Sequence, residues 1–563
     1  MRKIGNIKLE LSDWLYNAGV VGIANILESS GDVVKKTGNI IEFKEEALEN
    51  FEEKYFKYFI DKYRSFTSWQ RIVSFECEID NLKECPLNDA SLKRINDYIE
   101  YAKDRLKKNS FKSAYIIINN DNVDMLKEEK KLKKIKKGKN QDFKDIMPDV
   151  IEQLNNIKFI IDYLKKDGVK KIILAKNIIY DVIDKFWSGV SFLNTSNNTK
   201  NMYDNFKEYF IDNTSTYLNE DKTKYKYKCF SCDSPISKLS KPASYDLTWI
   251  NKMGVDMSRK TSHFWNFYGD SFICPICNLV YSCIPAGFTV IRDKGIFINE
   301  NSSMEDIIKV NNTSIDNNTS FEELEDKSYL MIANSLKQSE VERSSKEIDN
   351  IQIIKLDNSN NRRPYTFNVL SKNKLKVIIN HRKTLNVLIK GTFKNSSNEY
   401  INIYREVIGR LYNNKNQFDI INDLLVLNLN GKFNRLGYVK SIIKINNDFI
   451  GGIMGKQGVY YKDIDKIQQL GYDLKEVYKN KKADNKMNGI CYRLLNALKT
   501  KNQNRFMDTI LNAYMYAGKQ IPVILLDSLK GDNKLQTVGY AFILGLQGEN
   551  GKLSLCKEEK ANE

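Results

Sequence analysis

The sequence predicts an α+β multidomain protein, in which a mixed α/β N-terminal body carries an inserted four-cysteine knuckle subdomain and a helical bundle follows at the C-terminus. Three observations support this prediction. The 563 residues exceed what one hydrophobic core usually serves. Two Cys-x-x-Cys pairs stand in the middle of the chain. Beyond Lys462, segments separated by polar joints repeat apolar residues at three- and four-residue spacing.

The order of these patterns divides the chain into four regions. Asn/Thr/Ser-rich segments at 194–200 and 311–320, which are typical of surface loops, flank the cysteine pairs. We therefore expect an N-terminal α/β body at 1–225, a knuckle subdomain at 226–300, a continuation of the body with hairpins at 301–450, and the C-terminal helical bundle at 451–563.

The N-terminal region mixes helix and strand patterns. Apolar residues from Leu9 to Leu27 follow helical spacing, with Ser12 or Asp13 as the N-cap. Further along we expect, in order, a strand at 39–43, an aromatic-rich helix ending at Phe66, a strand at 113–120, and a strand that passes into a helix at 169–187.

The segments after the cysteines predict further strands and a helix. Residues 287–299 alternate around Asp-Lys-Gly, and residues 365–380 give a second hairpin pattern. Ser320 and Glu323 form a capping box at the start of a helix. The mixed body is therefore expected to continue on the C-terminal side of the cysteine region.

The composition indicates a folded protein with a polyanionic partner. Hydrophobic residues make up 42% of the chain, which is enough to bury real cores. The formal net charge is +17 with a pI near 9.1, which favours nucleic acid as a partner. An alternative stays open, because AT-rich codons specify Lys, Asn and Ile and a biased genome could supply part of this charge.

The sequence also predicts a compartment. The first twenty residues lack the continuous apolar core and the cleavage site of a signal peptide, and nowhere do eighteen uncharged apolar residues run together. Nine cysteines in a large unsecreted chain favour reduced thiols and metal over disulfides. We expect a cytoplasmic protein with no membrane partner.

The paired cysteines predict a metal site. Cys229 and Cys232 form a first hook, Cys274 and Cys277 form a second, and 41 residues separate the hooks. Each hook can offer two thiolates at an edge of a tetrahedron, with Zn–S at about 2.3 Å. Because four thiolates fill the coordination sphere, a bound Zn²⁺ would have no position for a catalytic water. The expected role of Zn²⁺ is structural.

Alternatives to this assignment remain open. An iron–sulfur cluster could use the same four cysteines, or the four cysteines could be buried separately and never meet. Cys283 or His263 could replace one ligand, although each is expected in the core or at the surface.

The densest positive segment is the run KEEKKLKKIKKGK at 127–139. Leu132 and Ile135 are three residues apart, so the run is either a helix with one apolar edge and a cationic face or a solvated loop. A cationic face would neutralise phosphates without reading sequence. Candidate nucleic-acid contacts are Lys130, Lys131, Lys133, Lys134, Lys136 and Lys137, together with Arg362 and Arg363 at the second hairpin.

Several catalytic motifs are missing from the sequence. The two histidines, His263 and His381, lie far apart, whereas HD-type and HNH-type nuclease centres need clustered histidines. The segment GGIMGKQG at 451–458 lacks the spacing and the hydroxyl of a P-loop. Glu76 and Glu78 do not stand out from the surface charge. We therefore expect a protein that is not an enzyme.

With these motifs in place, the chain resembles a known family. The segment DWLYNAGVVGI at 13–23, the hooks KCFSC and CPIC, and the helical C-terminus resemble the CXXC–CXXC large subunit, Cst type, of the type I-B CRISPR Cascade complex in the Cas-eight superfamily. This resemblance implies a non-catalytic subunit with guide RNA, target double-stranded DNA and other Cascade subunits as partners. It also implies recognition of the protospacer-adjacent motif, help with R-loop formation, and recruitment of a helicase–nuclease.

A further hypothesis concerns the C-terminal bundle, which resembles a Cascade small subunit. Translation could start internally at Met454, after Gly451-Gly452-Ile453, and yield the bundle as a separate product. The alternative is that Met454 is an ordinary loop methionine. The rival functions are a stand-alone zinc-ribbon nucleic-acid-processing enzyme and a DNA-binding regulator, although no helix-turn-helix pattern favours the latter.

Overall fold

The computed structural model describes most of the chain in two compact units. Unit 1 comprises Met1–Glu325 and Ile353–Phe367, and unit 2 comprises Asp326–Gln352 and Asn368–Glu563. Each unit is described separately below. The described residues are 6–84, 86–118, 123–138, 140–251, 272–313, 315–316, 319–335, 351–360, 364–370, 372–394, 398–453, 459 and 461–548.

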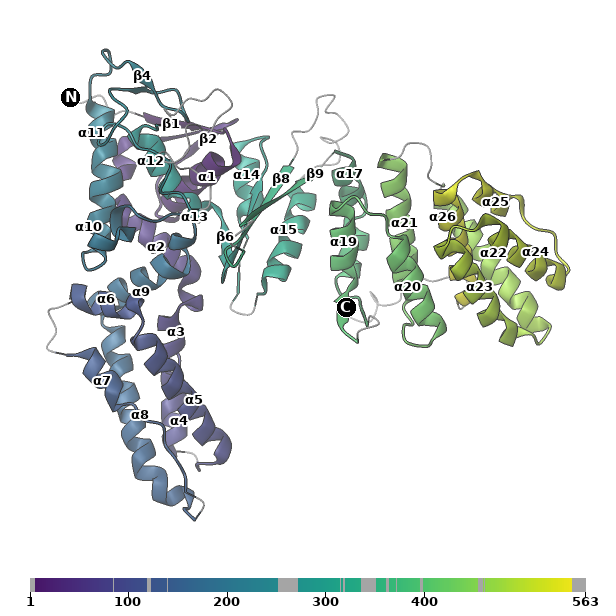
Figure 1. Cartoon of the computed structure of the whole chain (residues 1–563), viewed down its shortest axis with the longest axis horizontal. Helices are drawn as coiled ribbons and strands as arrows, with labels where there is room; N and C mark the ends of the chain where they lie inside the picture. The colour runs from purple at the N-terminus through teal and green to yellow at the C-terminus, as the bar shows by residue number, and fades with distance from the viewer. Residues whose placement is uncertain are drawn as a thin grey trace. The chain divides into compact units, whose positions relative to one another are not determined.

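The strands of unit 1 form small sheets. One has the order β1-β3-β2 with antiparallel neighbours, and β4 and β5 form a two-stranded hairpin. Another has the order β6-β7-β8-β9 (Figure 1). The bounds are β1 Asn6–Glu10, β2 Lys35–Thr37, β3 Ile40–Lys44, β4 Tyr227–Lys228, β5 Pro235–Ile236, β6 Thr289–Ile291, β7 Lys294–Asn299, β8 Ile351–Asp357 and β9 Tyr365–Leu370.

Helices supply most of unit 1. The first begins after Asp13, whose Oδ1 accepts hydrogen bonds from the backbone N–H groups of Leu15 and Tyr16 at 2.8 and 3.2 Å, so Asp13 is the N-cap. The bounds are α1 Trp14–Ser29, α2 Phe51–Tyr63, α3 Ser68–Val73, α4 Glu76–Glu84, α5 Asp89–Leu106, α6 Asn109–Ile118, α7 Met125–Lys131, α8 Phe143–Lys165, α9 Asp167–Asp181, α10 Met202–Phe206, α11 Asn213–Asn219, α12 Pro275–Ser282, α13 Ile284–Gly287 and α14 Met304–Asn311. Helix α15, Phe321–Ser335, begins in unit 1 and continues into residues assigned to unit 2.

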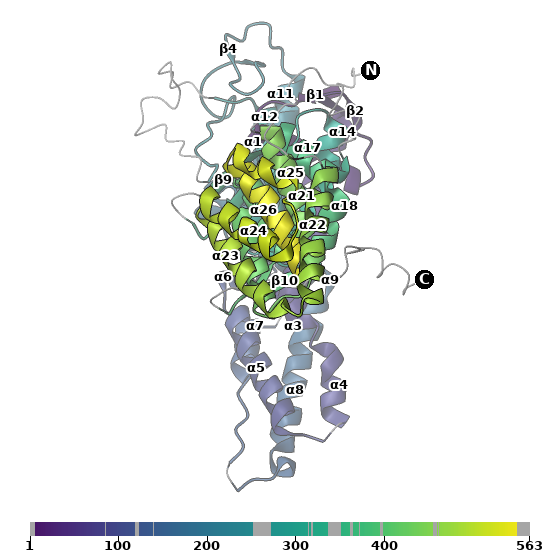
Figure 2. The ribbon, with the colours of Figure 1, turned by 90° about the vertical axis from the view of Figure 1, so that its right-hand side faces the viewer.

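Unit 1 has two hydrophobic cores. The first joins α1, α2, α9, α12 and α13 around fully buried side chains such as Phe56, Phe59 and Trp187. The second lies among α3 to α9, and Figure 2 shows α4, α5 and α8 of this part running alongside one another. Its members include Ile99, Leu154 and Ile161. The cysteine hooks belong to the first core, which contains three of their four side chains.

Three predicted elements differ from the structure. Residues 109–118 form α6 and residues 167–181 form α9, although strands were expected at 113–120 and at the start of 169–187. The run in α9 is largely buried, and the run in α6 is partly buried, with Ile116 exposed. Apolarity without period 2 does not separate a strand from a packed helix. The second hairpin was also placed wrongly, because β9 neighbours β8 at Ile351–Asp357 and is followed by a helix.

Other predicted elements are confirmed. The strand expected at 39–43 is β3, and the hairpin expected at 287–299 is formed by β6 and β7, with Ile291 opposite Lys294. The capping box is present: Ser320 Oγ accepts from Glu323 N at 3.1 Å, and Glu323 Oε2 accepts from Ser320 N at 3.2 Å. The predicted mixture of an α/β body, a four-cysteine region and a helical C-terminus is therefore correct.

Unit 2 is mainly helical, with one two-stranded hairpin of β10 and β11. Within the described residues, no helix of either unit combines the length and the apolar content that crossing a bilayer requires. The bounds are α17 Lys372–Asn380, α18 Arg382–Leu388, β10 Thr392–Lys394, β11 Tyr400–Asn402, α19 Ile403–Tyr412, α20 Phe418–Leu429, α21 Leu436–Ile453, α22 Tyr461–Asn480, α23 Met487–Lys499, α24 Gln503–Ala517, α25 Val523–Leu526 and α26 Asp532–Gln547.

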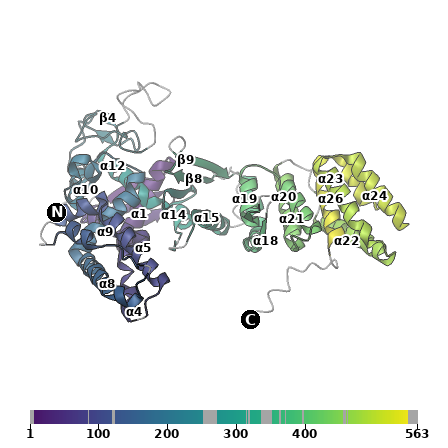
Figure 3. The ribbon, with the colours of Figure 1, turned by 60° about the horizontal axis from the view of Figure 1, so that its bottom comes forward.

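The last helices of unit 2 pack closely (Figure 3). Gly471 of α22 and Gly545 of α26 lie where the two helices meet. A Cβ atom on Gly545 would lie 1.9 Å from the carbonyl oxygen of Gln468, and one on Gly471 would lie 2.1 Å from that of Phe542. Only glycine allows this approach of the two backbones. Met454, the proposed internal start, lies outside the described residues.

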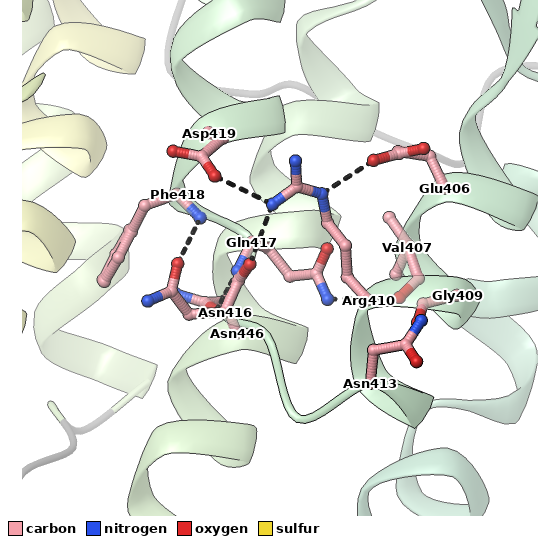
Figure 4. Close-up of polar contacts among 10 residues, drawn as sticks. All are labelled: Glu406, Val407, Gly409, Arg410, Asn413, Asn416, Gln417, Phe418, Asp419 and Asn446. Atoms are coloured by element: carbon pink, nitrogen blue, oxygen red, sulfur yellow. Dashed lines mark hydrogen bonds and ion pairs between the residues drawn. The ribbon is translucent and has the colours of Figure 1, made fainter. Parts of the chain in front are cut away.

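A polar cluster joins α19 to α20 in unit 2 (Figure 4). Arg410 Nε donates to Glu406 at 2.8 Å, and its Nη1 donates to Asp419 at 3.0 Å. Behind it, the buried Gln417 donates its backbone N–H to Asn446 Oδ1 at 2.7 Å. The guanidinium therefore neutralises two carboxylates from different helices at the bend between them.

Candidate metal centre

The first hook lies in the tight turn between β4 and β5. The backbone N–H of Cys229 donates to Ser234 O at 2.8 Å, and that of Asp233 donates to Cys229 O at 3.0 Å. Asp233 has a φ of 56°, in the left-handed region that aspartate tolerates better than most residues. This turn brings the two cysteines of the hook onto one side of the hairpin.

The second hook is the start of α12. Cys274 is the N-cap of this helix, and its Sγ accepts from the backbone N–H of Cys277 at 3.5 Å. Pro275 occupies the first helical position, where its fixed φ suits a helix and no backbone N–H is needed. Helix geometry therefore sets the separation of Cys274 and Cys277.

The structure brings the two hooks together. All four Sγ atoms lie within 4.8 Å of one another. Cys232 Sγ lies 3.7 Å from Cys274 Sγ, and the backbone N–H of Cys274 donates to Cys229 Sγ at 3.2 Å. With Zn–S at about 2.3 Å, the edge of a tetrahedron of sulfurs is about 3.8 Å. The four cysteines therefore fit a tetrahedral thiolate site, with Cys232 exposed and the other three buried.

Hydrogen bonds among the four thiols lower the pKa of one thiol and raise the pKa of others. The pKa of Cys232 is lowered because the thiols of Cys229, Cys274 and Cys277 donate hydrogen bonds to its sulfur. The pKa values of Cys274 and Cys277 are raised, chiefly because these groups lose hydrogen bonds to Cys229 and Cys232 on ionising. Four thiolates at this spacing would repel one another, and a bound cation removes that repulsion.

Comparison with known families agrees with this geometry. Residues 222–289, which span both hooks, match the model of a family described as CRISPR-associated protein (Cas_CXXC_CXXC). This segment is therefore similar to CRISPR-associated proteins of the CXXC–CXXC type. No curated protein and no solved structure matches the chain significantly.

The CXXC–CXXC segment packs directly against α1. Gly22 approaches so closely that a Cβ atom there would lie 2.0 Å from the carbonyl oxygen of Cys283, and one on Gly287 would lie 2.1 Å from that of Ala18. Tyr16 is buried beside the second hook, with its hydroxyl 3.9 Å from Cys277 Sγ. The N-terminal segment DWLYNAGVVGI and the second hook, which both support the family resemblance, are therefore in contact.

Aromatic side chains bind the carbonyl groups at the end of α12 and along α13. Tyr55 and Trp187 both donate to Ser282 O, at 2.9 and 3.2 Å. Tyr58 donates to Ala286 O at 3.0 Å. Sequence reasoning missed this role, although tyrosines on a buried helix such as α2 usually need a hydrogen-bond partner, which was an available signal.

Of the two alternative ligands, Cys283 lies outside the four-cysteine group. Cys283 is fully buried, and its Sγ lies 3.7 Å from Ser282 Oγ, outside the four-cysteine group. Burial raises its pKa. His263 lies outside the described residues. His381 is buried in unit 2, where its Nε2 lies 2.8 Å from Asp448.

The lysine run is neither a continuous helix nor a solvated loop. Helix α7 ends at Lys131, and an extended segment follows in which Leu132 and Ile135 are buried. Asn96 of α5 holds it, accepting from Ile135 N at 2.8 Å and donating to Ile135 O at 2.9 Å. The sequence correctly singled out Leu132 and Ile135 as the apolar residues of the run. Neither of the two expected structures, a helix or a solvated loop, describes the extended segment that carries them.

The candidate lysines on this segment are all exposed. Several already contact other side chains, which reduces their free charge: Lys131 pairs with Glu128 at 2.7 Å, Lys134 pairs with Glu100 at 2.9 Å, and Lys137 lies 3.6 Å from the centre of the Phe143 ring. Arg362 and Arg363 lie outside the described residues.

Proposed function

We propose that the chain is the non-catalytic large subunit of a type I-B CRISPR RNA-guided surveillance complex (Cascade) in the cytoplasm. The observation that carries the proposal is the match of residues 222–289 to a CRISPR-associated family at a segment whose four cysteines meet. In this role the subunit would recognise the protospacer-adjacent motif, aid R-loop formation and help recruit the helicase–nuclease. Its partners would be guide RNA, target DNA and the other Cascade subunits.

The metal in this proposal is structural Zn²⁺. The four sulfurs can complete a tetrahedral shell, so that a bound Zn²⁺ would keep no open position for water. The protein's own contribution is to orient the sulfurs through the β4–β5 turn and the N-cap of α12. The net charge of +17 supports a polyanionic partner.

Purification of the tagged chain from its native host tests the proposal. We expect short repeat-derived guide RNA, several co-purifying subunits and about one zinc per chain. Visible charge-transfer absorption with iron in place of zinc would identify an iron–sulfur cluster instead. A chain that carries no RNA and turns over nucleic acid with Mg²⁺ or Mn²⁺ would contradict the proposal and support the stand-alone enzyme.

A further inference from the structure

The four cysteines of the hooks differ in their exposure to solvent. Cys232 is exposed. The other three, Cys229, Cys274 and Cys277, are each at most 1% exposed. The oxidation of a cysteine by a dissolved oxidant depends on its thiolate character and its exposure. Because metal ligation requires thiolates in all four cases, exposure is what distinguishes Cys232 as the cysteine that an oxidant meets first.

The buried cysteines are screened by two tyrosines. Tyr16 of α1 and Tyr281 of α12 are both 2% exposed, and their rings meet edge to face with centroids 5.7 Å apart. The hydroxyl of Tyr16 lies 3.9 Å from Cys277 Sγ, and that of Tyr281 lies 3.0 Å from Ser231 Oγ in the first hook. A small oxidant therefore reaches the group through the turn of the first hook rather than through α1 or α12.

A second sulfur lies within reach of Cys232. Cys274 Sγ is 3.7 Å from Cys232 Sγ. A disulfide places its two sulfurs about 2.05 Å apart, so a movement of less than about 2 Å would join them. Strands β4 and β5, which carry the first hook, have two residues each. Such a short hairpin has few ladder hydrogen bonds to oppose this movement.

We propose that the hooks form a peroxide-responsive switch, in which Cys232 and Cys274 join in a disulfide and the bound Zn²⁺ is released. The Cys232 thiolate attacks one oxygen of hydrogen peroxide and breaks the O–O bond, which gives a sulfenic acid and a hydroxide ion. The Cys274 thiolate then attacks the sulfur of the sulfenic acid, forms the S–S bond and expels a second hydroxide ion. Two protons from solvent convert the hydroxide ions to water, and the two electrons that the sulfurs lose reduce the peroxide.

The disulfide leaves too few ligands for the metal. Of the four cysteines, Cys229 and Cys277 remain as thiolates, whereas a structural zinc site uses four ligands. Oxidation should therefore release the metal, and reduction should restore the site. This inference rests on the metal of the proposed function, to which it adds regulation by an oxidant.

The test follows zinc release from the purified chain in hydrogen peroxide, with a chromogenic chelator to report the free metal. We expect about one zinc released per chain, together with a Cys232–Cys274 disulfide in the peptide map. Dithiothreitol and added Zn²⁺ should restore the starting zinc content, because a disulfide is reversible. Sulfinic acid at Cys232 without a disulfide would overturn the switch, and a Cys229–Cys232 disulfide would overturn the assigned pair.

The variant Cys232→His separates metal binding from oxidation. Imidazole is also a zinc ligand, so this variant can keep its metal, but it has no sulfur at this position to form a disulfide. We expect peroxide to release its zinc at least about 10-fold more slowly than in wild type. The matched control is Cys77→Ser, which removes an exposed thiol of α4 outside the group and should release zinc like wild type. If Cys232→His holds no zinc, the peptide map of the wild-type chain still decides the proposal.

The outcomes separate this inference from the proposed function. Zinc content before peroxide is added, and co-purifying guide RNA, test the proposed function. A zinc-loaded chain that keeps its metal in peroxide, or loses it equally fast from Cys232→His, overturns the inference alone. A chain that is purified without zinc and RNA contradicts the proposed function, and its peptide map after peroxide still tests the pairing of Cys232 with Cys274.

Discussion

The two units of the molecule share one kind of helix packing but differ in the other interactions that hold their helices. Each has a helix contact so close that only glycine fits, at Gly22 in unit 1 and at Gly545 in unit 2. In unit 1, four cysteines from two hooks that are far apart in sequence also meet. In unit 2, hydrogen-bonded pairs such as Arg410 with Glu406 also join the helices. The comparison teaches that unit 1 has a place where a bound ion could add to the packing, whereas the links described in unit 2 come from the chain's own side chains.

Removal of the Zn²⁺ that we propose for the hooks should have the largest effect and should be confined to unit 1. Structural zinc contributes about 10–16 kcal/mol to small zinc-dependent folds, so chelation or Cys274→Ser should open the hooks and expose α12. Zinc analysis with hydrogen exchange resolved by segment measures this. The control Cys283→Ala should keep its zinc, because Cys283 lies outside the group. An equal loss of protection from hydrogen exchange in α22 and α26 would show that the effect is not confined to unit 1.

Filling either glycine contact should come next. Gly22→Ala and Gly545→Ala each place a methyl group about 2 Å from a carbonyl oxygen and should cost about 3 kcal/mol of unfolding free energy. Each variant should increase hydrogen exchange in its own unit. The control is Gly489→Ala in α23, where nothing lies within 4 Å of the new Cβ atom, and it should stabilise unit 2 by up to about 1 kcal/mol.

A pH dependence should distinguish unit 1 further. Burial raises the pKa of Asp184 to about 6. Since the native state then holds this proton more tightly than the unfolded chain, the contribution to stability is present below about pH 4 and is lost as pH rises to 6. Asp184→Asn should therefore stabilise unit 1 by about 1–2 kcal/mol at pH 8, a value discounted for partial exposure.

Urea unfolding at pH 8 and pH 5 measures this effect, and the gain should shrink at the lower pH. The exposed Asp61→Asn provides the control and should change stability by less than about 0.5 kcal/mol at both pH values. A gain from Asp184→Asn that grows on acidification would contradict the argument.

The smallest expected effect concerns the polar link of unit 2. Arg410→Met leaves Glu406 and Asp419 without their shared cation and should cost about 1 kcal/mol, with no dependence on chelator. Unfolding of the zinc-loaded and chelated variants measures both points. Arg493→Met on the exposed face of α23 should change stability by less than about 0.5 kcal/mol. A chelator-dependent cost would show that the two units are coupled.

The sequence predicted features that depend on local patterns, and it did not predict features that depend on contacts between distant segments. The Cys-x-x-Cys spacing predicted that Cys229 and Cys274 would meet, and helical periodicity predicted the C-terminal helices. The described part of the run expected as a strand, residues 113–118, lies in α6, which packs against α9, and a single sequence does not reveal this contact. The partner of β9 precedes it in the chain, and the contact of Gly22 with Cys283 joins residues that no local pattern links.

The contact between α1 and α13 has a consequence for biosynthesis. The face of α1 around Gly22 is complete once Ser29 is made, but its partner exists only after Gly287 has left the ribosome. At about 5–20 residues per second, this delay is on the order of 10 to 50 s. During this time the apolar face of α1 has no partner to cover it. Long-range contacts of this kind also slow folding. The nascent chain should therefore engage chaperones until the second hook emerges.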